Sequence, residues 1–276
     1  MTTTTHGIGL LGCGAIGRSL AMAIEDGTIR GARLVALYDK DRSYAQKLSQ
    51  RLEAKVPPTD SFQEFIETPG MSMVVEAASQ AAVHQHAEAI ISRGKQLLIM
   101  STGALLNTDL FSKLASLSQE TGCRIFVPSG AIGGIDAIKA SRSGLYSVVL
   151  TTRKPPASIV DIASTDPDAI KRITAPTVVF EGNATEAVKR FPANINVAAT
   201  LSLAGIGPEK TLVRIIADPD AKGNIHEIYA KGQSGEMRFV MENVPHPENP
   251  MTSYQAVLSA IETLKGACEG GFRIGA

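Results

Sequence analysis

The first half of the chain alternates short apolar runs with segments whose apolar residues recur every three or four positions. Residues 8–11 form a run typical of a buried strand, and Ile16, Leu20 and Ile24 share one helical face. Further strands are expected over 34–38, 73–75, 96–100 and 124–127, and helices from 61, over 81–93 and from 108. This alternation predicts right-handed βαβ units around a doubly wound parallel sheet.

After about residue 128 the pattern changes to longer strand-like runs, some of which alternate in polarity. Strands are expected over 145–152, 212–217, 225–230 and 237–244, with helices near 185–190 and 197–204. Such a pattern predicts a mixed or antiparallel sheet with one covered face, within an α+β domain. Near the C-terminus one helical stripe is expected from Tyr254, Val257, Leu258, Ile261 and Leu264.

The last helix needs a partner for its apolar stripe, and we expect it to return to the first domain. The expected organisation is therefore residues 1–128 plus 250–276 as the first domain and 129–249 as the second. A chain of 276 residues is long enough for two modest domains.

Composition narrows the classes of function. The 27 basic and 27 acidic residues give zero formal net charge, which argues against a nucleic-acid partner. No window approaches 18 consecutive apolar residues, so we expect no membrane span. The three cysteines lie far apart without a CxxC pair, which suits a reducing cytoplasm. Because no His, Cys and carboxylate residues cluster at ligand spacing, we expect no metal.

A glycine-rich loop follows the first expected strand. Gly12, Cys13, Gly14, Ala15, Ile16 and Gly17 match G-x-G-x-x-G, and Asp39 lies 22 residues after Gly17 at the end of the next strand. In this context Gly12 permits a tight turn, Gly14 lets a pyrophosphate approach the backbone, and Gly17 allows close packing of helix and strand. The motif predicts a Rossmann-type dinucleotide-binding domain.

The choice of dinucleotide depends on the residues around position 39. The carboxylate of Asp39 would bind the adenosine ribose and repel a 2′-phosphate, which favours NAD. Lys40 and Arg42 follow at once and are placed to receive that phosphate if Asp39 turned away. We therefore expect NAD as the cofactor, with NADP also accepted.

Small residues occupy three further strand ends, where a dinucleotide binds in folds of this class. They lie at 77–79, 101–104 and 129–134, and of these Ala78 and Ser79 are predicted cofactor contacts. Each loop taken alone is equally consistent with an ordinary turn.

One of the five histidines interrupts a strand pattern. Alternation places His226 on one face with Ile228 and Ala230, opposite Glu227 and Tyr229. Two interpretations stay open at this point, a purely structural histidine and an acid/base with a pKa near neutrality. Of the other four, His6 is expected to be exposed, one of His84 and His86 to face solvent while the other caps a strand-end loop, and His246 to lie in a loop.

Several segments together resemble L-aspartate dehydrogenases along nearly the whole chain. The matching segments are 12–17, 75–80, 101–105, 128–134, 191–198, 217–219, 224–226 and 242–245. The resemblance implies NAD(P)-dependent oxidation of L-aspartate to iminoaspartate, which hydrolyses to oxaloacetate and ammonia. It also implies a homodimer that makes contact through the sheets of the second domain, a substrate and dimerisation domain. His226 would be the catalytic residue, and Ala131 and Asn196 would contact the nicotinamide half of the cofactor.

Several alternatives stay open at this stage. Arg153, Lys154, Lys139 and Lys189 are candidate partners for the substrate carboxylates, and the sequence does not rank them. If His226 only orients the substrate, Lys139 or Lys189 would be the base. Other functions are a reductase of the homoserine dehydrogenase or dihydrodipicolinate reductase type, or a non-catalytic NAD(H)-sensing protein. Iminoaspartate could serve NAD synthesis, or the reaction could serve aspartate breakdown.

Overall fold

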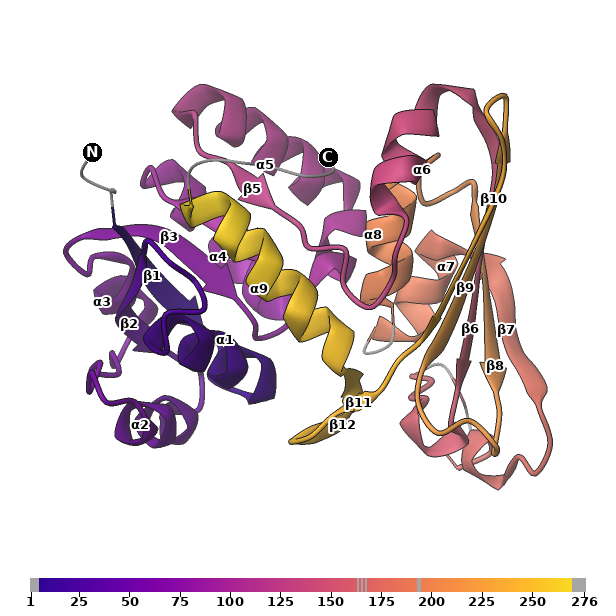
Figure 1. Cartoon of the computed structure of the whole chain (residues 1–276), viewed down its shortest axis with the longest axis horizontal. Helices are drawn as coiled ribbons and strands as arrows, with labels where there is room; N and C mark the ends of the chain where they lie inside the picture. The colour runs from indigo at the N-terminus through magenta and orange to yellow at the C-terminus, as the bar shows by residue number, and fades with distance from the viewer. Residues whose placement is uncertain (1–4, 163, 165, 167, 193–194, 270–276) are drawn as a thin grey trace. The chain divides into compact units, whose positions relative to one another are not determined.

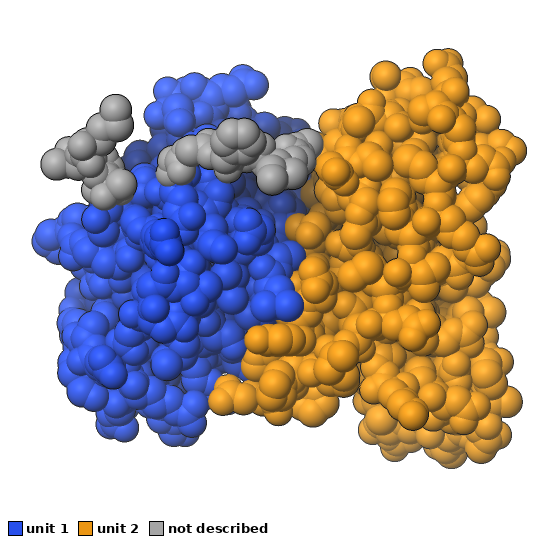
Figure 2. Space-filling model, viewed as in Figure 1, with its two compact units in different colours: residues 1–128, 257–274 blue, residues 129–256, 275–276 orange. Residues whose placement is uncertain are grey.

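The computed structural model describes residues 5–162, 164, 166, 168–192 and 195–269, and the chain forms two compact units (Figures 1 and 2). Unit 1 contains residues 1–128 and 257–274, and unit 2 contains residues 129–256 and 275–276. Within the described part of the chain, no helix has the length and hydropathy needed to cross a membrane.

Unit 1 is built on a five-stranded sheet, sheet A, in which all neighbouring strands are parallel. Its order is β2-β1-β3-β4-β5, so the chain reverses its direction of winding between β1 and β3. The strands are β1 (His6–Leu11), β2 (Ala32–Tyr38), β3 (Met71–Glu76), β4 (Gln96–Ile99) and β5 (Ile125–Phe126). The predicted doubly wound parallel sheet is confirmed.

The helices of sheet A follow the expected positions, with two additions. They are α1 (Ala15–Glu25), α2 (Arg42–Arg51), α3 (Phe62–Ile66), α4 (Gln80–Ser92), the 3₁₀ helix η1 (Thr102–Leu106) and α5 (Thr108–Thr121). Helix α2 was not predicted, because only Ala45 and Leu48 of that polar helix are buried. The 3₁₀ helix η1 lies where a loop of small residues is expected. The expected exposure of His6 is wrong, since it is the partly buried first residue of β1.

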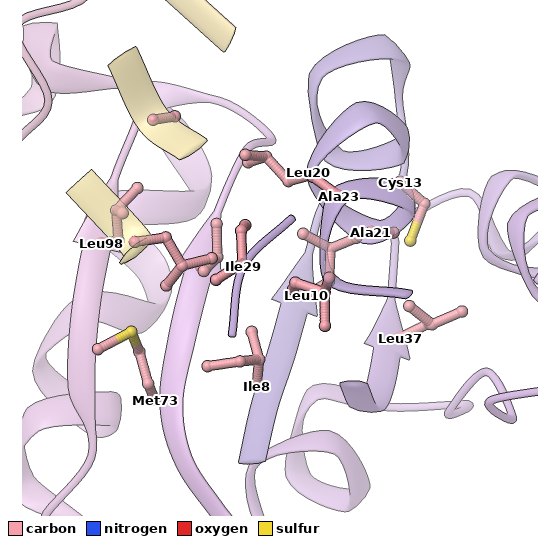
Figure 3. Packing of buried hydrophobic residues seen from close by; sticks show 14 of the residues in the cluster. Ile8, Leu10, Cys13, Leu20, Ala21, Ala23, Ile29, Leu37, Met73 and Leu98 are labelled. Carbon is pink, nitrogen blue, oxygen red and sulfur yellow. The ribbon is translucent and has the colours of Figure 1, made fainter. Parts of the chain in front are cut away.

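The core of unit 1 joins sheet A to α1, α2 and the last helix, α9 (Tyr254–Cys268). Figure 3 shows the part of this core between the sheet and α1. From α9 the buried residues of this core are Ala260, Leu264, Ala267 and Cys268, and Ile261 packs against them. The expected apolar stripe is wrong at Tyr254 and Leu258, which are 41% and 40% exposed. Val257 and Leu264 of the expected stripe are buried, and the small residues Ser259, Ala260, Ala267 and Cys268, which carry a weaker hydropathy signal, complete the buried face.

Unit 2 contains a mixed five-stranded sheet, sheet B, with the order β10-β9-β6-β8-β7. Only β6 and β8 pair in parallel, and the other neighbours are antiparallel. The strands are β6 (Leu145–Lys154), β7 (Thr177–Asn183), β8 (Thr211–Ala217), β9 (Ile225–Gly232) and β10 (Gly235–Glu242). The mixed sheet was predicted, but β7 was not, because it is an edge strand with an exposed start.

Three helices cover one face of sheet B, and among the described residues the opposite face has no helix on it (Figure 1). They are α6 (Ile135–Ser141), which was not predicted, α7 (Ala184–Arg190) and α8 (Asn196–Ala204). Unit 2 also contains the 3₁₀ helices η2 (Arg142–Gly144), η3 (Pro156–Ser158) and η4 (Ile170–Arg172), and the antiparallel pair β11 (Pro245–His246) and β12 (Asn249–Ser253). His246 therefore lies in a short strand rather than in the expected loop.

Candidate functional site

The glycine loop of unit 1 connects β1 to α1 and packs against the loop that follows β3. Gly12 has a φ of 99°, and a Cβ atom there would lie 2.6 Å from the carbonyl of Ala77. A Cβ atom on Gly17 would lie 2.0 Å from the carbonyl oxygen of Gly12. Glycine is therefore required at both positions by close backbone approach.

Gly14 has a different surrounding from the other two glycines. It is the N-cap of α1, where it offers no side-chain acceptor, and the first turn of the helix has no acidic residue. A Cβ atom at Gly14 would have no neighbour within 4 Å. The N-terminus of α1, which begins with Ala15 and Ile16, thus combines open space with uncapped N–H groups, the features of an anion site.

Asp39 lies directly after β2 and is fixed against this loop. One carboxylate oxygen accepts a 2.7 Å hydrogen bond from the Cys13 N–H, and the other accepts a 3.0 Å bond from the Asp41 N–H. An ionised carboxylate has about four acceptor positions, so Asp39 can still accept from a ribose hydroxyl. Nearby, Arg42 forms a 2.7 Å ion pair with Asp60, while Lys40 is exposed.

Glu76, at the end of β3, is a buried carboxylate whose role the sequence analysis missed. It is 1% exposed and accepts bonds from the Ala78 N–H (2.8 Å), the Ser101 N–H (3.0 Å), the Ser101 hydroxyl (2.8 Å) and the Met100 N–H (3.2 Å). Burial raises the pKa of Glu76, and these hydrogen bonds oppose the rise. The side chain holds the loops after β3 and β4 together.

The two predicted cofactor contacts after β3 lie at the surface of unit 1. Ala78 is exposed, and its N–H donates one of the four hydrogen bonds that the Glu76 carboxylate accepts. Ser79 is exposed and caps α4, where its hydroxyl accepts a 3.2 Å bond from the Ala82 N–H. The structure thus gives Ser79 a local capping role, and its contact with the cofactor stays a prediction.

In unit 2, His226 lies near the start of β9 on the covered face of sheet B. It is 2% exposed, and Ile228 and Ala230 are buried on the same face, as the alternation predicts. Its register partner on β6 is Thr152, whose hydroxyl lies 3.0 Å from Nδ1 of the ring. Among the described residues, Nε2 has no hydrogen-bond partner.

The expectation of a near-neutral histidine pKa is wrong for this chain. Burial, with a smaller contribution from the charge of Lys154, lowers the pKa of His226 to about 3. The imidazole is therefore neutral across the physiological range. The sequence shows the alternation, but it does not show how completely the covering helices remove water from this face.

The four candidate cations of unit 2 have different surroundings. Arg153 forms a 2.9 Å ion pair with Asp218, and Lys139 and Lys189 are exposed. Lys154, the last residue of β6, is 5% exposed, and burial lowers its pKa to about 8. The structure therefore brings Lys154, and not the other three, to the same buried face as His226.

Ala131 lies in the loop before α6 and is linked to the end of β10. Its carbonyl accepts a 3.1 Å bond from Nδ2 of Asn243, which also donates to the Met241 carbonyl at 3.4 Å. These two acceptors fix the orientation of the amide. Among the described residues, the buried Oδ1 atom of Asn243 has no hydrogen-bond donor, which leaves an open acceptor beside Ala131.

Asn196 is the exposed first residue of α8. The two preceding motif residues that the resemblance included, Ala193 and Asn194, lie outside the described residues.

The remaining histidines have structural surroundings. His84 is exposed as expected, but His86 stacks on the Phe62 ring at 3.8 Å between centroids instead of capping a loop. His246 is buried and accepts a bond from the Glu248 N–H. Within the described ranges, no group of three or more His, Cys, Asp or Glu side chains is arranged to hold a metal ion.

A parallel sheet with this glycine loop and acid, joined in one chain to a mixed sheet with a buried histidine, defines a two-domain dinucleotide-dependent oxidoreductase. Comparison with known proteins supports this class of protein. Residues 12–128 match the family model "Homoserine dehydrogenase, NAD binding domain", and residues 136–267 match "Aspartate dehydrogenase, C-terminal".

Individual relatives define the family more narrowly. The chain is 46% identical to an L-aspartate dehydrogenase of Methanocella arvoryzae, over 95% of this chain and 97% of the relative. It is 44% identical to that of Methanosarcina barkeri, over 94% and 95% of the two chains. The crystal structure of aspartate dehydrogenase from Thermotoga maritima matches with a TM-score of 0.76 and 31% identity, covering 98% of this chain and 99% of the other. The chain belongs to the aspartate dehydrogenase family, which confirms the resemblance.

Proposed function

We propose that this chain is an L-aspartate dehydrogenase that oxidises L-aspartate to iminoaspartate, which then hydrolyses to oxaloacetate and ammonia. Full-length similarity to L-aspartate dehydrogenases supports the substrate. The observation that carries the proposal is the buried His226, held at Nδ1 by the Thr152 hydroxyl, within the segment that matches the aspartate dehydrogenase C-terminal model. Oxidation of an amino acid requires a proton acceptor of this kind.

We infer that the dinucleotide is NAD, with NADP also accepted. The residues that would hold it in unit 1 are Gly12, Gly14, Ala15, Ile16, Gly17, Asp39, Ala78 and Ser79. The open space at Gly14, the uncapped start of α1 and the fixed carboxylate of Asp39 support this fit. In unit 2, Ala131 and Asn196 would contact the nicotinamide half, and the buried Oδ1 of Asn243 supports a ligand beside Ala131. When bound, the cofactor supplies the hydride acceptor.

His226 would act as the catalytic base. Loss of hydride from Cα requires a neutral amine, because an ammonium has no lone pair to donate toward the breaking C–H bond. The neutral imidazole would take the ammonium proton, or activate the water that attacks the imine; because its pKa is about 3 in the chain alone, this role requires the bound substrate to stabilise the imidazolium. The Thr152 hydroxyl can donate to Nδ1 or accept from it, so this contact orients the ring; in the tautomer that carries Nδ1–H, Nε2 is the basic nitrogen.

We further propose that residues 1–128 plus 250–276 form the dinucleotide-binding domain and 129–249 the substrate and dimerisation domain. The homodimer would form through the uncovered face of sheet B. Supporting this, the partly exposed side chains Val149, Leu212 and Tyr229 are register neighbours on that face. A contiguous apolar patch of this kind usually marks a protein contact.

We also propose that the protein acts in the cytoplasm. Cys13, Cys123 and Cys268 are all buried free thiols, and burial raises the pKa of Cys13 to about 12, so it stays a protonated, unreactive thiol. Two metabolic roles remain open for the product: iminoaspartate could feed NAD synthesis, or the enzyme could serve aspartate breakdown.

The test is a turnover assay with the purified protein. L-Aspartate and NAD should produce NADH, followed by its absorbance, whereas homoserine should not. Turnover of homoserine, or of dihydrodipicolinate in the reverse direction, would instead indicate a reductase of those types. NADH binding without turnover of any amino acid would favour the NAD(H)-sensing function.

A further inference from the structure

Lys154 is a buried cation that the catalytic base proposed above does not use. It ends β6 with its side chain on the covered face of sheet B, two residues after Thr152 and six after Val148, all of them buried. Burying an ammonium group without a counter-ion is costly, so proteins usually pair it or place it where a ligand supplies the opposite charge.

No acidic side chain in the described part of the chain forms an ion pair with Lys154. Asp218 is the nearest acid along the backbone, since its N–H donates a 2.8 Å bond to the Lys154 carbonyl. Its carboxylate, however, pairs with Arg153 through one oxygen and accepts from the Asp220 N–H through the other. The neighbouring carboxylate is thus already engaged, and Lys154 keeps its charge uncompensated.

The charge of Lys154 lies close to His226 on the same face of sheet B. Thr152 is the register partner of His226, so Lys154 lies about 6–7 Å further along the same face. Its charge is close enough to contribute to the lowered pKa of His226. An anion bound at Lys154 would therefore lie next to the base, and it would offset the Lys154 charge, the smaller of the two effects that disfavour the imidazolium.

We propose that Lys154 is a substrate-binding residue whose ammonium group binds a carboxylate of the dicarboxylate substrate beside His226. This inference rests on the proposed function, which supplies L-aspartate as the ligand. It also ranks the four cations, because Arg153 is paired and Lys139 and Lys189 are exposed.

The test compares Lys154→Met and Lys154→Arg with the exposed control Lys210→Met, which lies in the same unit. For Lys154→Met the KM for L-aspartate should rise about 100-fold with a much smaller fall in kcat, because a charge-assisted bond made in the ground state is lost. The Arg variant should recover part of this loss, and Lys210→Met should match the wild type. NADH affinity should be unchanged in all three.

Thermal unfolding separates a binding role from a structural one. Replacing an unpaired buried cation by an apolar side chain should leave the unfolding midpoint of Lys154→Met equal to or above that of the wild type. A lower midpoint accompanied by weaker NADH binding would overturn the inference in favour of a structural lysine. An unchanged KM, or a loss confined to kcat, would also overturn it.

Binding of succinate, a dicarboxylate that cannot be oxidised at an amine, distinguishes this inference from the proposed function. Calorimetry with the NADH-loaded wild type should show binding that Lys154→Met loses. If the wild type binds succinate through Lys154 but does not turn over L-aspartate, the proposed function fails while the carboxylate site stands. If the wild type turns over L-aspartate and both proteins bind succinate equally, the inference about Lys154 fails alone.

Discussion

At the scale of single residues, the carboxylates of unit 1 show how one side chain can have a structural and a binding role. Asp39 accepts hydrogen bonds from two backbone N–H groups and keeps acceptor capacity for a ribose. Glu76 accepts four bonds and is wholly buried. The glycine motif predicts the role of Asp39, because the spacing between the motif and this acid is fixed. The role of Glu76 is not predictable in this way, because it depends on two loops that meet only in the folded sheet.

Asp39→Ala should weaken NAD binding and improve the relative use of NADP. The repulsive carboxylate is removed while Lys40 and Arg42 remain. Steady-state kinetics with both dinucleotides provides the measurement. Asp41→Ala is the matched control, since Asp41 caps α2 through the Ser43 N–H, and its NAD/NADP ratio should stay near that of the wild type. An unchanged ratio in Asp39→Ala would contradict the assignment to the ribose.

His226→Ala should lower kcat by roughly 10²–10⁴-fold, the usual contribution of a positioned proton-transfer group. NAD affinity should barely change, because the glycine loop and Asp39 lie in unit 1. His226→Asn keeps hydrogen bonding to Thr152 but cannot accept a proton near neutral pH. Near-normal turnover of the Asn variant would show that the ring only orients the substrate. In that case Lys139 or Lys189 would be the candidate base.

The buried His226 should also make the protein less stable in acid. Its pKa is about 3 in the folded chain and about 6.5 when unfolded, so below pH 6.5 the unfolded state binds a proton that the folded state does not. The free energy of unfolding should therefore fall as pH decreases from 6.5 toward 3, by up to about 1.4 kcal/mol per pH unit from this group. Denaturant unfolding of the wild type and His226→Asn between pH 6.5 and 5 should show a shallower slope for the variant. Parallel slopes would mean that the folded-state pKa is not depressed.

At the scale of elements, the sequence predicts those that bury a recognisable apolar pattern. The strands of sheet A and the strands β6, β8, β9 and β10 of sheet B follow from such runs. The missed elements, α2, α6 and β7, bury few large side chains, and their conformation is decided by tertiary contacts. The neutral state of His226 and the isolation of Lys154 could not be predicted either, because both depend on the pairing of β6 with β9, 74 residues apart at Thr152 and His226.

The last helix offers a direct test of which face is buried. Leu264→Ala should lower the free energy of unfolding by about 2–5 kcal/mol, because Leu264 is fully buried in the core of unit 1. Leu258→Ala, on the exposed side of the same helix, should cost less than about 0.5 kcal/mol. Urea unfolding of both variants provides the comparison. Equal losses would show that the helix packs through the wider stripe expected from the sequence.

At the scale of the whole molecule, the asymmetry of sheet B has a consequence for assembly. Helices α6, α7 and α8 cover one face of the sheet (Figure 1). His226 and Lys154, the residues of the proposed chemistry, are buried on this face. The opposite face retains apolar side chains at the centre of the sheet, where Val149 pairs with Leu212 and Tyr229. Because adjacent residues of each strand point to opposite faces, one sheet can hold the substrate residues and the proposed dimer contact.

Val149→Glu should therefore dissociate the proposed homodimer. A carboxylate at the centre of the uncovered face would have to be buried without a partner in a self-complementary contact, where two copies would also repel each other. Light scattering coupled to size exclusion should show a dimer for the wild type and a monomer for the variant. Phe111→Glu, an exposed aromatic position on α5 in unit 1, is the control and should remain dimeric. A dimeric Val149→Glu protein would exclude this face as the contact, and a monomeric wild type would exclude the homodimer itself.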